Sequence, residues 1–391
     1  MTEYNIPKHW QVKKLGEVLK VSSGKGLKVN LLQGGDFPVY GGNGINGYHS
    51  EFLIENPRLI IGRVGAKCGV TCITKPKSWV TDNALIVEPI IDDFDIKFFQ
   101  LKLEYENLNK LSVSTAQPVI SGSKIYNYEI LLPPLPEQQA IVSKIEELLS
   151  DLDNSKQQLQ TAQQQLKVYR QSLLKWAFEG KLTNNNVKDG ELPDGWEYKD
   201  LKDITSLLGD GLHGTPKYSD NGEYYFINGN NLTDGKIEIK DNTKRVNKEE
   251  YEKYKKPLNE NTIFVSINGT LGYTAFYNNE KVVLGKSACY FNVQDSINKY
   301  YIRYYLTSNS FVSYANKNAT GSTIKNVGLK TMREFKIPIP PYLEEQQQIV
   351  DELESKLTVC DKIEETISQS LLQTETLRQS ILKKAFEGEL I

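Results

Sequence analysis

The chain has few of the residues that build metal centres, disulfide frameworks or catalytic dyads. Its 391 residues include four cysteines and three histidines, which are scattered along the sequence. Cys68 and Cys72 are close together, but no second pair follows that could complete a tetrahedral zinc site. Without a cysteine framework or a secretory leader at the N-terminus, we expect a protein of the reducing cytoplasm.

Long apolar runs and a strong charge of either sign are also missing. No run approaches the roughly 20 apolar residues of a transmembrane helix, so we expect no membrane partner. The formal net charge of −2 argues against a generally basic nucleic-acid coat. Each globular region nevertheless has a small excess of basic residues, whereas the helical regions are acidic. Such weakly basic regions are enough to contact DNA phosphates if other subunits supply part of the phosphate contacts.

What the sequence does contain is two copies of one unit. Ala177-Phe-Glu-Gly180 returns as Ala385-Phe-Glu-Gly388, and each copy opens with a Pro-x-x-Trp motif. The segments 137–182 and 345–390 align without a gap, whereas the stretch before them is longer in the second copy. A gap-free segment indicates a rigid element whose length matters, and a variable one indicates a globular region with divergent loops. The period far exceeds that of solenoid repeats, so this is domain duplication.

The two gap-free segments are predicted to be long helices. In the first, apolar residues alternate at spacings of four and three, which is typical of a coiled-coil seam, and the second carries a less regular stripe. Each would be about 65–70 Å long. Because neither can bury its stripe alone, we predict that they pair, and the pseudo-two-fold repeat follows most simply if they run antiparallel with one globular domain at each end; the alternative is two amphipathic helices packed on their own domains. The predicted pairing residues are Ile141, Ile145, Leu148, Leu152, Leu159, Leu166, Leu173, Ile349, Leu353, Leu357, Ile363, Ile367 and Ile381.

The remaining regions, residues 10–132 and 196–339, are predicted to be rich in β-strands and turns. Short helices are expected near Ile96–Leu103 and Lys299–Thr307. The fold class is thus α+β, with two β-rich domains separated by two long, antiparallel paired helices in pseudo-two-fold symmetry. The predicted boundaries are 1–136 for the first domain, 137–182 for the first helix, 183–192 for a linker, 193–343 for the second domain and 344–391 for the second helix.

Three motifs imitate enzyme sites, but each stands in the wrong context. Gly42-Asn-Gly-Ile-Asn-Gly47 matches a dinucleotide-binding fingerprint, yet no helical pattern follows it. Pro340-Pro-Tyr342 resembles a methyltransferase motif, but it is preceded by Ile339, which cannot accept a hydrogen bond from an adenine amine. A nuclease-like Pro-Asp and Glu-x-Lys pattern at 193–199 is too short to bring two strands together. We therefore predict no catalytic site and no metal site in this chain.

The order of elements is informative as a whole. A globular region, Pro-Pro-Leu-Pro-Glu-Gln-Gln at 133–139, a long helix and Ala-Phe-Glu-Gly, followed by a second such set, resembles the specificity subunit of type I restriction–modification enzymes. The resemblance covers essentially the whole chain. The first globular region is also similar to target-recognition domains of that family through Tyr40–Gly44, Ile61–Gly65 and Thr81–Asn83.

This resemblance implies a division of labour. Each target-recognition domain would bind one half of an asymmetric, gapped site in double-stranded DNA. The paired helices would set the spacing and dock two methyltransferase subunits. S-adenosylmethionine, ATP and Mg²⁺ would belong to the methyltransferase and restriction (motor) subunits, with none in this chain. Alternatives are the recognition subunit of a type IIB-like system, a coiled-coil scaffold with two domains that do not bind DNA, and a stand-alone enzyme.

Polar and basic side chains in the turns shared by both copies are the predicted DNA contacts. Arginine and lysine suit guanine, asparagine and glutamine suit adenine, and Lys25 and Lys28 suit phosphates. Faint echoes between the copies, such as Gln117–Ile120 with Gly321–Ile324, guide the choice. The predicted contacts are Asn43, Arg63, Lys67, Asn83, Gln117 and Ser121 in the first domain and Asn230, Asn268, Lys286, Ser322 and Lys325 in the second.

Overall fold

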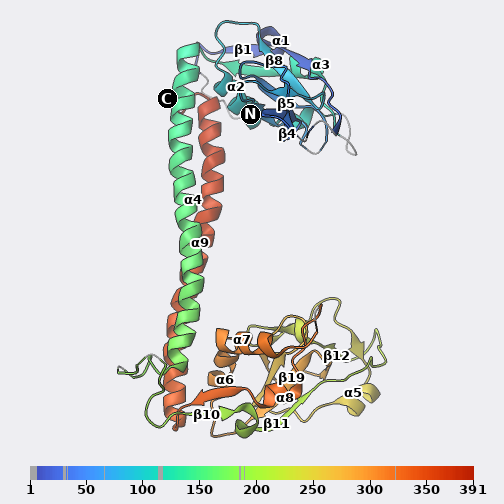
Figure 1. Cartoon of the computed structure of the whole chain (residues 1–391), viewed down its shortest axis with the longest axis vertical. Helices are drawn as coiled ribbons and strands as arrows, with labels where there is room; N and C mark the ends of the chain where they lie inside the picture. Colours follow the sequence, from blue (N-terminus) through green and yellow to red (C-terminus); the bar gives the residue numbers. More distant parts are fainter. Residues whose placement is uncertain are drawn as a thin grey trace. The chain divides into compact units, whose positions relative to one another are not determined.

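The computed structural model describes residues 7–29, 32, 34–65, 67–112, 118–184, 186–188, 190–321 and 323–391. The chain divides into two compact units. Unit 1 comprises Met1–Gln160 and Ser368–Ile391, and unit 2 comprises Thr161–Ile367. Each unit contains one β-rich region, called here the first head (7–132) and the second head (193–339), together with parts of two long helices (Figure 1).

The long helices are α4 (Leu135–Phe178) and α9 (Leu343–Phe386), each of 44 residues. At 1.5 Å per residue each is about 66 Å long. Both end two residues before a glycine with a left-handed backbone, Gly180 at φ 75° and Gly388 at φ 79°. The N–H groups of Lys181 and Glu389 then donate to carbonyl oxygens of the last helical turn, which is the expected termination at glycine. The predicted segments 137–182 and 344–391 extend past these ends by four and five residues.

Within each unit the two helices pack antiparallel, as predicted. In unit 1, Asp153 pairs with Arg378 at 3.4 Å, and Lys156 pairs with Glu375 at 3.4 Å. Residue numbers therefore fall along α9 as they rise along α4. In unit 2, Arg170 of α4 lies 2.6 Å from Asp361 and 3.0 Å from Glu364 of α9.

The predicted pairing residues mostly face inward. Ile141, Ile145, Leu166, Leu173, Ile349, Leu353, Ile367 and Ile381 are buried, and Leu148, Leu152, Leu159 and Leu357 are half-buried. Ile363 differs, because 44% of its surface is exposed. Its neighbour Glu364 is half-buried and faces Arg170 instead.

The inward stripe of α9 is more regular than its apolar residues suggest. The inward positions from Cys360 onward are Cys360, Glu364, Ile367, Leu371, Thr374, Arg378 and Ile381, all buried or half-buried. Their spacing alternates between four and three, as in α4. Three of these heptad positions are polar: Glu364, Thr374 and Arg378. A pattern of apolar residues alone misses them and selects exposed neighbours such as Ile363 and Leu377 instead.

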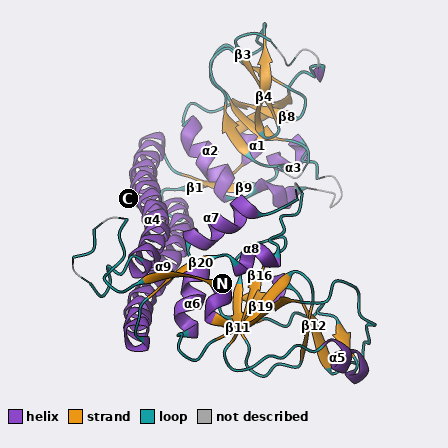
Figure 2. Ribbon diagram, turned by 60° about the horizontal axis from the view of Figure 1, so that its bottom comes forward, coloured by secondary structure: helices purple, strands orange, loops and turns teal. Residues whose placement is uncertain are grey.

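The two heads have matching strand orders. The first has a four-stranded sheet in the order β2-β8-β5-β6, a three-stranded sheet β4-β3-β7 and a pair β1-β9; the second has β11-β19-β16-β17, β15-β12-β18 and β10-β20. In each three-stranded sheet one strand pair is parallel, β3 with β7 and β12 with β18. Figure 2 shows the strands of both heads in orange. The second head adds a small hairpin, β13-β14.

The first head contains β1 (Gln11–Lys14), α1 (Leu15–Val18), β2 (Leu19–Ser23), β3 (Phe37–Gly41), β4 (Gly44–His49), β5 (Leu59–Gly62), β6 (Thr71–Ile73), β7 (Trp79–Val80), β8 (Ala84–Pro89), α2 (Ile96–Tyr105), η2 (Leu108–Leu111), α3 (Gly122–Tyr126) and β9 (Glu129–Leu132). The glycine motif at 42–47 thus forms the β3–β4 hairpin with no helix after it, as expected.

The second head contains β10 (Glu197–Asp200), η3 (Leu201–Ile204), β11 (Thr205–Asp210), β12 (Tyr224–Ile227), η4 (Gly229–Asn231), β13 (Leu232–Thr233), β14 (Lys236–Ile237), β15 (Arg245–Val246), α5 (Lys248–Tyr254), β16 (Thr262–Ser266), β17 (Thr274–Phe276), β18 (Val282–Leu284), β19 (Ala288–Val293), α6 (Lys299–Leu306), α7 (Asn309–Asn318), α8 (Leu329–Arg333) and β20 (Lys336–Ile339). The two short helices predicted from the sequence are α2 and α6, so this prediction is confirmed.

Aromatic side chains join each head to the end of a long helix. In unit 1, Phe386 of α9 packs edge-on against Phe98 of α2 at 5.7 Å between ring centroids. In unit 2, Phe178 of α4 packs in the same way against Tyr301 and Tyr305 of α6, at 5.1 and 4.7 Å. The Phe of the repeated Ala-Phe-Glu-Gly motif is therefore a core residue in both units.

The other repeated motifs build the same junction. The indole N–H of Trp10 donates to Glu137 at 3.1 Å, and that of Trp196 donates to Glu345 at 3.1 Å. A Cβ atom on Gly388 would approach the Pro7 side chain to 2.4 Å, so the helix end and the Pro-x-x-Trp opening are in close contact. These motifs are explained by structure and need no catalytic role.

None of the helices in the described part of the chain has the length and apolar character that crossing a membrane requires.

Candidate nucleic-acid interface

Four loops of the first head meet through backbone hydrogen bonds. The N–H of Arg63 donates to Asn83 O at 2.9 Å, and Arg63 O accepts from Ile120 N at 3.0 Å. The N–H of Gly65 donates to Pro118 O at 2.9 Å. These bonds connect the loops that follow β5, β7 and η2. The β3–β4 turn joins them, because a Cβ atom on Gly42 would lie only 2.9 Å from Asn83 O.

The second head repeats this frame bond for bond. Ile267 N donates to Ser287 O at 3.0 Å, Val327 N donates to Ile267 O at 2.8 Å, and Gly269 N donates to Lys325 O at 2.9 Å. A Cβ atom on Gly229 would lie 2.9 Å from Ser287 O. Gly65 and the corresponding Gly269 both have a left-handed backbone, with φ of 82° and 78°. We call this set of bonds the recognition frame.

The frame shows which positions of the two heads correspond. Arg63 corresponds to Ile267, and Asn83 corresponds to Ser287. Pro118 corresponds to Lys325, which lies three residues beyond the position predicted from the Gln117–Ile120 and Gly321–Ile324 echo. That alignment is corrected by the bond pattern, because the segment before this loop forms the ten-residue helix α7 in the second head and only the four-residue helix η2 in the first. The backbone is thus shared while the side chains differ in size and charge.

In the first head the frame gathers most of the predicted contacts. Backbone hydrogen bonds join Arg63 directly to Asn83 and to the segment that leads to Ser121. Asn43 follows Gly42, which belongs to the same frame. Lys67 is also near, because its carbonyl oxygen would lie 2.8 Å from a Cβ atom placed on Gly62. Lys25 is tied to the same edge, since its N–H donates to Val80 O at 2.9 Å. Lys28 lies three residues further along this loop. Gln117 lies outside the described residues.

Arg63 presents a guanidinium that its head does not neutralise. Its Nη1 donates to the Ser23 hydroxyl at 3.3 Å, and it forms no ion pair with any described carboxylate. An unneutralised guanidinium on such a half-buried residue can form two hydrogen bonds with a guanine edge or with a phosphate. Lys25 differs because its ammonium lies 5.6 Å from the centroid of the Trp79 ring.

In the second head the predicted contacts surround a hollow of about 590 Å³. Asn230 and Asn268 line it, together with Asn228, Tyr273 and Lys240, which the sequence patterns did not single out. Asn228 and Asn230 belong to one asparagine-rich loop, a compositional signal that could have been used. Tyr273 carried no signal, since an exposed tyrosine in a loop follows no period.

The other predicted contacts of the second head lie around this frame. Lys286 is exposed and follows Gly285, and its N–H donates to Leu212 O at 3.1 Å. Lys325 is exposed, but its ammonium donates to Asn316 Oδ1 at 2.6 Å. Ser322 lies outside the described residues.

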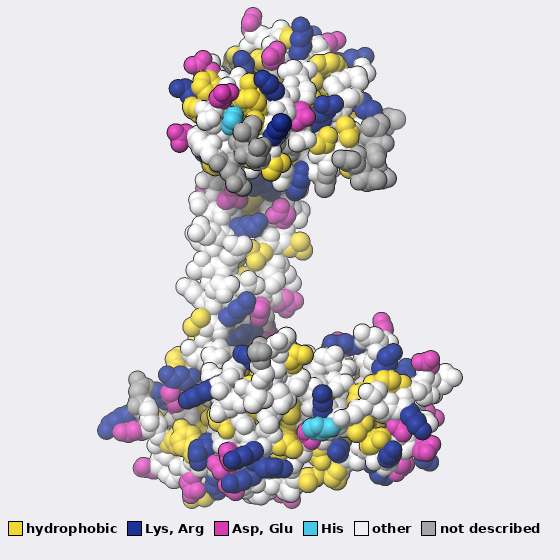
Figure 3. Space-filling view, turned by 45° about the vertical axis from the view of Figure 1, so that its right-hand side comes forward, with side chains coloured by type: hydrophobic (Ala, Val, Ile, Leu, Met, Phe, Trp, Pro, Cys, Tyr) yellow, Lys and Arg dark blue, Asp and Glu magenta, His cyan; other side chains and the backbone are white. Residues whose placement is uncertain are grey.

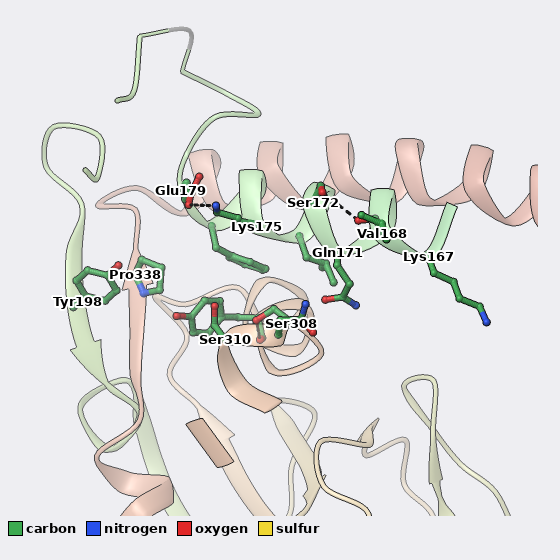
Figure 4. Close-up of a pocket in the computed structure, with 14 residues that line it drawn as sticks. Lys167, Val168, Gln171, Ser172, Lys175, Glu179, Tyr198, Ser308, Ser310 and Pro338 are labelled. Carbon is green, nitrogen blue, oxygen red and sulfur yellow. Dashed lines mark hydrogen bonds and ion pairs between the residues drawn. The ribbon is translucent and has the colours of Figure 1, made fainter. Parts of the chain in front are cut away.

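A second cavity, of about 620 Å³, lies between the C-terminal part of α4 and the second head (Figure 4). Gln171 points from α4 toward Ser308 and Ser310, while Tyr198 and Pro338 close the far end. Among the described residues that line it, no nucleophile forms a hydrogen bond with a base. Across the part of the chain that is described, no group of three or more His, Cys, Asp or Glu side chains could hold a metal ion.

The charge on the surface is mixed. On the face shown in Figure 3, Lys and Arg side chains alternate with Asp and Glu over both heads, with no broad field of one sign. Binding of DNA to this face through charge alone would be weak, so recognition there must depend on particular side chains.

Comparisons with known proteins relate both copies of the repeat to one family. Residues 7–164 and 193–373 match the family model for the type I restriction modification DNA specificity domain. The whole chain is 24% identical to the type I restriction enzyme EcoDI specificity subunit of Escherichia coli, of which it covers 90%. Over 80% of its length it is 25% identical to the EcoBI specificity subunit of the same organism, covering 70% of that subunit.

Solved structures share the fold. A chain from a structural study of complex assembly and conformational transition of the type I R-M system aligns with a TM-score of 0.75 at 19% identity, covering 99% of this chain and 100% of that one. The HsdS subunit from Thermoanaerobacter tengcongensis aligns with a TM-score of 0.63 at 18% identity over 99% of both chains. At these identities the likeness concerns the fold.

Proposed function

Because this chain belongs to the type I restriction modification DNA specificity family, we propose that each of its heads binds one half of a gapped, asymmetric DNA site. The supporting observation is the recognition frame. Two heads with the same backbone bonds can present side chains to DNA in the same manner. Since Arg63 in one head corresponds to Ile267 in the other, the bases that they prefer must differ.

The paired helices are proposed to set the spacing between the half-sites. Both have 44 residues, and polar pairs such as Arg170 with Asp361 fix their register. Two recognition elements that bind one face of B-DNA need a separation of about one turn, near 10 base pairs, or a multiple of it. A helix pair of fixed register suits such a constant distance.

The helices are also proposed to dock two methyltransferase subunits. Both helices expose large apolar side chains that a solvated coiled coil does not need. Val168, Tyr169 and Val359 are 68%, 45% and 55% exposed in unit 2, and Leu372 and Leu377 are 71% and 51% exposed in unit 1. Exposed apolar side chains on the helices of each unit are consistent with one partner for each unit.

Catalysis and its cofactors are assigned to the partners in this proposal. The methyltransferase subunits would bind S-adenosylmethionine and methylate adenine, and restriction subunits would use ATP and Mg²⁺ to translocate and cleave DNA. This chain would contribute sequence choice in the cytoplasm. A type IIB-like arrangement, in which one partner chain both methylates and cleaves, would use the same heads and helices.

The proposal can be tested with the purified complex of this chain and its methyltransferase partner. A random DNA library is incubated with S-adenosylmethionine, and the methylated molecules are sequenced. We expect one motif with two short, different halves and an unspecified gap. A second preparation receives a foreign first head in place of residues 10–132 and should change one half only. Methylation without a motif, or a change in both halves, would contradict the proposal.

A further inference from the structure

The hollow of the second head is built from loops that are far apart in sequence. Its walls come from the loop after β12, the β13–β14 hairpin and the loop that follows it, the loop after β16 and the loop before β19. Three asparagine side chains, Asn228, Asn230 and Asn268, line it, with Tyr273 at its edge and Leu232 among the apolar residues. Tyr273 is 49% exposed. Such a concave, polar surface on the recognition frame calls for a ligand with matching hydrogen-bond groups.

The loop that carries Asn230 is held rigidly. Asn231 is buried, and its amide bonds to Asn228 N at 3.0 Å and Glu238 O at 2.9 Å. The hydroxyl of Ser287 accepts from Gly229 N at 2.8 Å and donates to Asn228 Oδ1 at 2.9 Å. These bonds fix the backbone on both sides of Asn230 before any ligand arrives.

The Asn230 side chain itself is unused. It is exposed, and its amide forms no hydrogen bond with any described residue. Only its backbone is tied down, since Lys240 Nζ donates to Asn230 O at 2.8 Å. Both the donor and the acceptor of this amide are therefore available on a preorganised backbone, which lowers the entropic cost of binding.

The charge of the hollow favours a base over a phosphate. Its charged lining residues are Glu238 and Lys240, whose charged groups lie 3.8 Å apart and offset each other. Lys240 is further occupied by Asn230 O. A phosphate needs unneutralised cations or several free N–H donors, whereas a base edge is neutral.

From these features we propose that the hollow binds the major-groove edge of an adenine in the second half-site through Asn230. The amide donates to N7 and accepts from the N6 amine. Adenine is the only base that presents an acceptor and a donor side by side at its major-groove edge. Guanine presents two acceptors at this edge and would leave the amide oxygen unpaired. The inference rests on the proposed function, since it names the base that the second head binds.

The test uses the complex with its methyltransferase partner and duplexes carrying its own motif. Each adenine of the second half-site is replaced in turn by 7-deazaadenine, which lacks N7 but keeps the N6 amine. At one position the wild-type complex should bind roughly ten- to a hundredfold more weakly. With Asn230→Ala that penalty should vanish, because the partner of N7 is already gone. Asn278→Ala, an exposed asparagine outside the hollow, should retain it.

Two results would overturn the inference. One is that 7-deazaadenine weakens binding of the Asn230→Ala variant as much as binding of the wild type at every position where the wild type is sensitive. The other is an Asn230→Ala variant that binds all duplexes more weakly by one factor, as loss of a phosphate contact would cause. Unchanged choice of the first half-site shows in the same data that the variant is folded. A complex without any gapped preference would instead contradict the proposed function, and this inference with it.

Discussion

Gln138 and Gln346, the glutamines of the repeated Pro-Pro motif, are buried at the starts of the long helices. Gln138 accepts from Asp95 N at 3.0 Å and donates to Asp93 O at 3.0 Å and to Pro133 O at 2.9 Å. Gln346 likewise accepts from Asn298 N at 2.8 Å. The amide is needed because it donates and accepts together, and it fastens the helix start to the loop before α2 or α6.

We predict that Gln138→Glu destabilises unit 1 by about 3 kcal/mol, because two carbonyl oxygens would lose their donor and face a carboxylate. Gln139→Glu is the matched control, since Gln139 is exposed on the next helical position. Urea unfolding followed by tryptophan fluorescence measures both. Equal midpoints for the two variants would show that the buried bonds contribute nothing.

A second residue-scale feature is the ion pair between the buried Lys102 and the half-buried Glu106 on the first head, 2.9 Å apart. Burial lowers the pKa of Lys102 despite the nearby Glu106 and Glu387. Burial would raise the pKa of Glu106, but Lys102, the Tyr128 hydroxyl and Lys110 outweigh it and hold this pKa below its usual value. Breaking such a pair leaves a buried charge without its partner.

Glu106→Gln should therefore cost about 3 kcal/mol at pH 7, and the exposed Glu104→Gln should cost almost nothing. Because the pKa of Lys102 lies below its unfolded value, the unfolded chain binds more protons and stability rises with pH. Removing Glu106, which raises the pKa of Lys102, lowers that pKa further in the variant, so its deficit should shrink as the pH rises from 7 toward the usual lysine pKa of about 10.4. It should also shrink below about pH 4, where the wild type loses the contribution of ionised Glu106. A deficit that stays constant across this range would contradict the assignment.

At the scale of elements, α4 and α9 are held in register by polar contacts of unequal burial. The Arg170 side chain is 22% exposed and touches two carboxylates, whereas Lys156 is 44% exposed and touches one. We predict that Arg170→Met costs about 1 kcal/mol and Lys156→Met less than half of that. Urea midpoints at low and high NaCl measure both losses. The difference in stability between the two variants should become smaller at high salt. A larger loss for Lys156→Met would contradict this ranking.

The elements also show how far sequence patterns can predict this fold. Helix ends near Gly180 and Gly388 and the two short helices follow from local chemistry, and the antiparallel pairing follows from the internal repeat, so these features could be predicted. The inward positions of Glu364, Thr374 and Arg378 could not, because a search for apolar periodicity passes over polar residues whose stems are buried. The apolar pattern therefore predicts Ile363 at the position that Glu364 occupies.

Sequence patterns predict only part of the candidate interface. Turn residues such as Asn43, Arg63 and Asn230 could be selected because both copies share the turns. The correspondence of Pro118 with Lys325 required the backbone bonds, since inserted residues hide it. The hollow around Asn230 draws on four loops separated by tens of residues, and no local pattern brings them together.

At the scale of the whole molecule, the proposed role makes helix length a determinant of the DNA site. Deleting one heptad from each helix at facing positions, 150–156 of α4 and 375–381 of α9, keeps the seam in phase. The helices become about 10 Å shorter, equal to the rise of about three base pairs. We predict a shortened gap or loss of methylation, measured by sequencing methylated library DNA. A gap of unchanged length with full activity would refute the spacing role.

The central claim is that this chain selects a split and asymmetric DNA sequence for its partners. The most direct measurement is long-read methylation sequencing of host DNA with the chain present, deleted and restored. The account predicts one gapped adenine motif with two unlike halves that disappears on deletion and returns on restoration. A methylation pattern that does not change when the chain is removed, or a dependent motif that is continuous or symmetric, would contradict it.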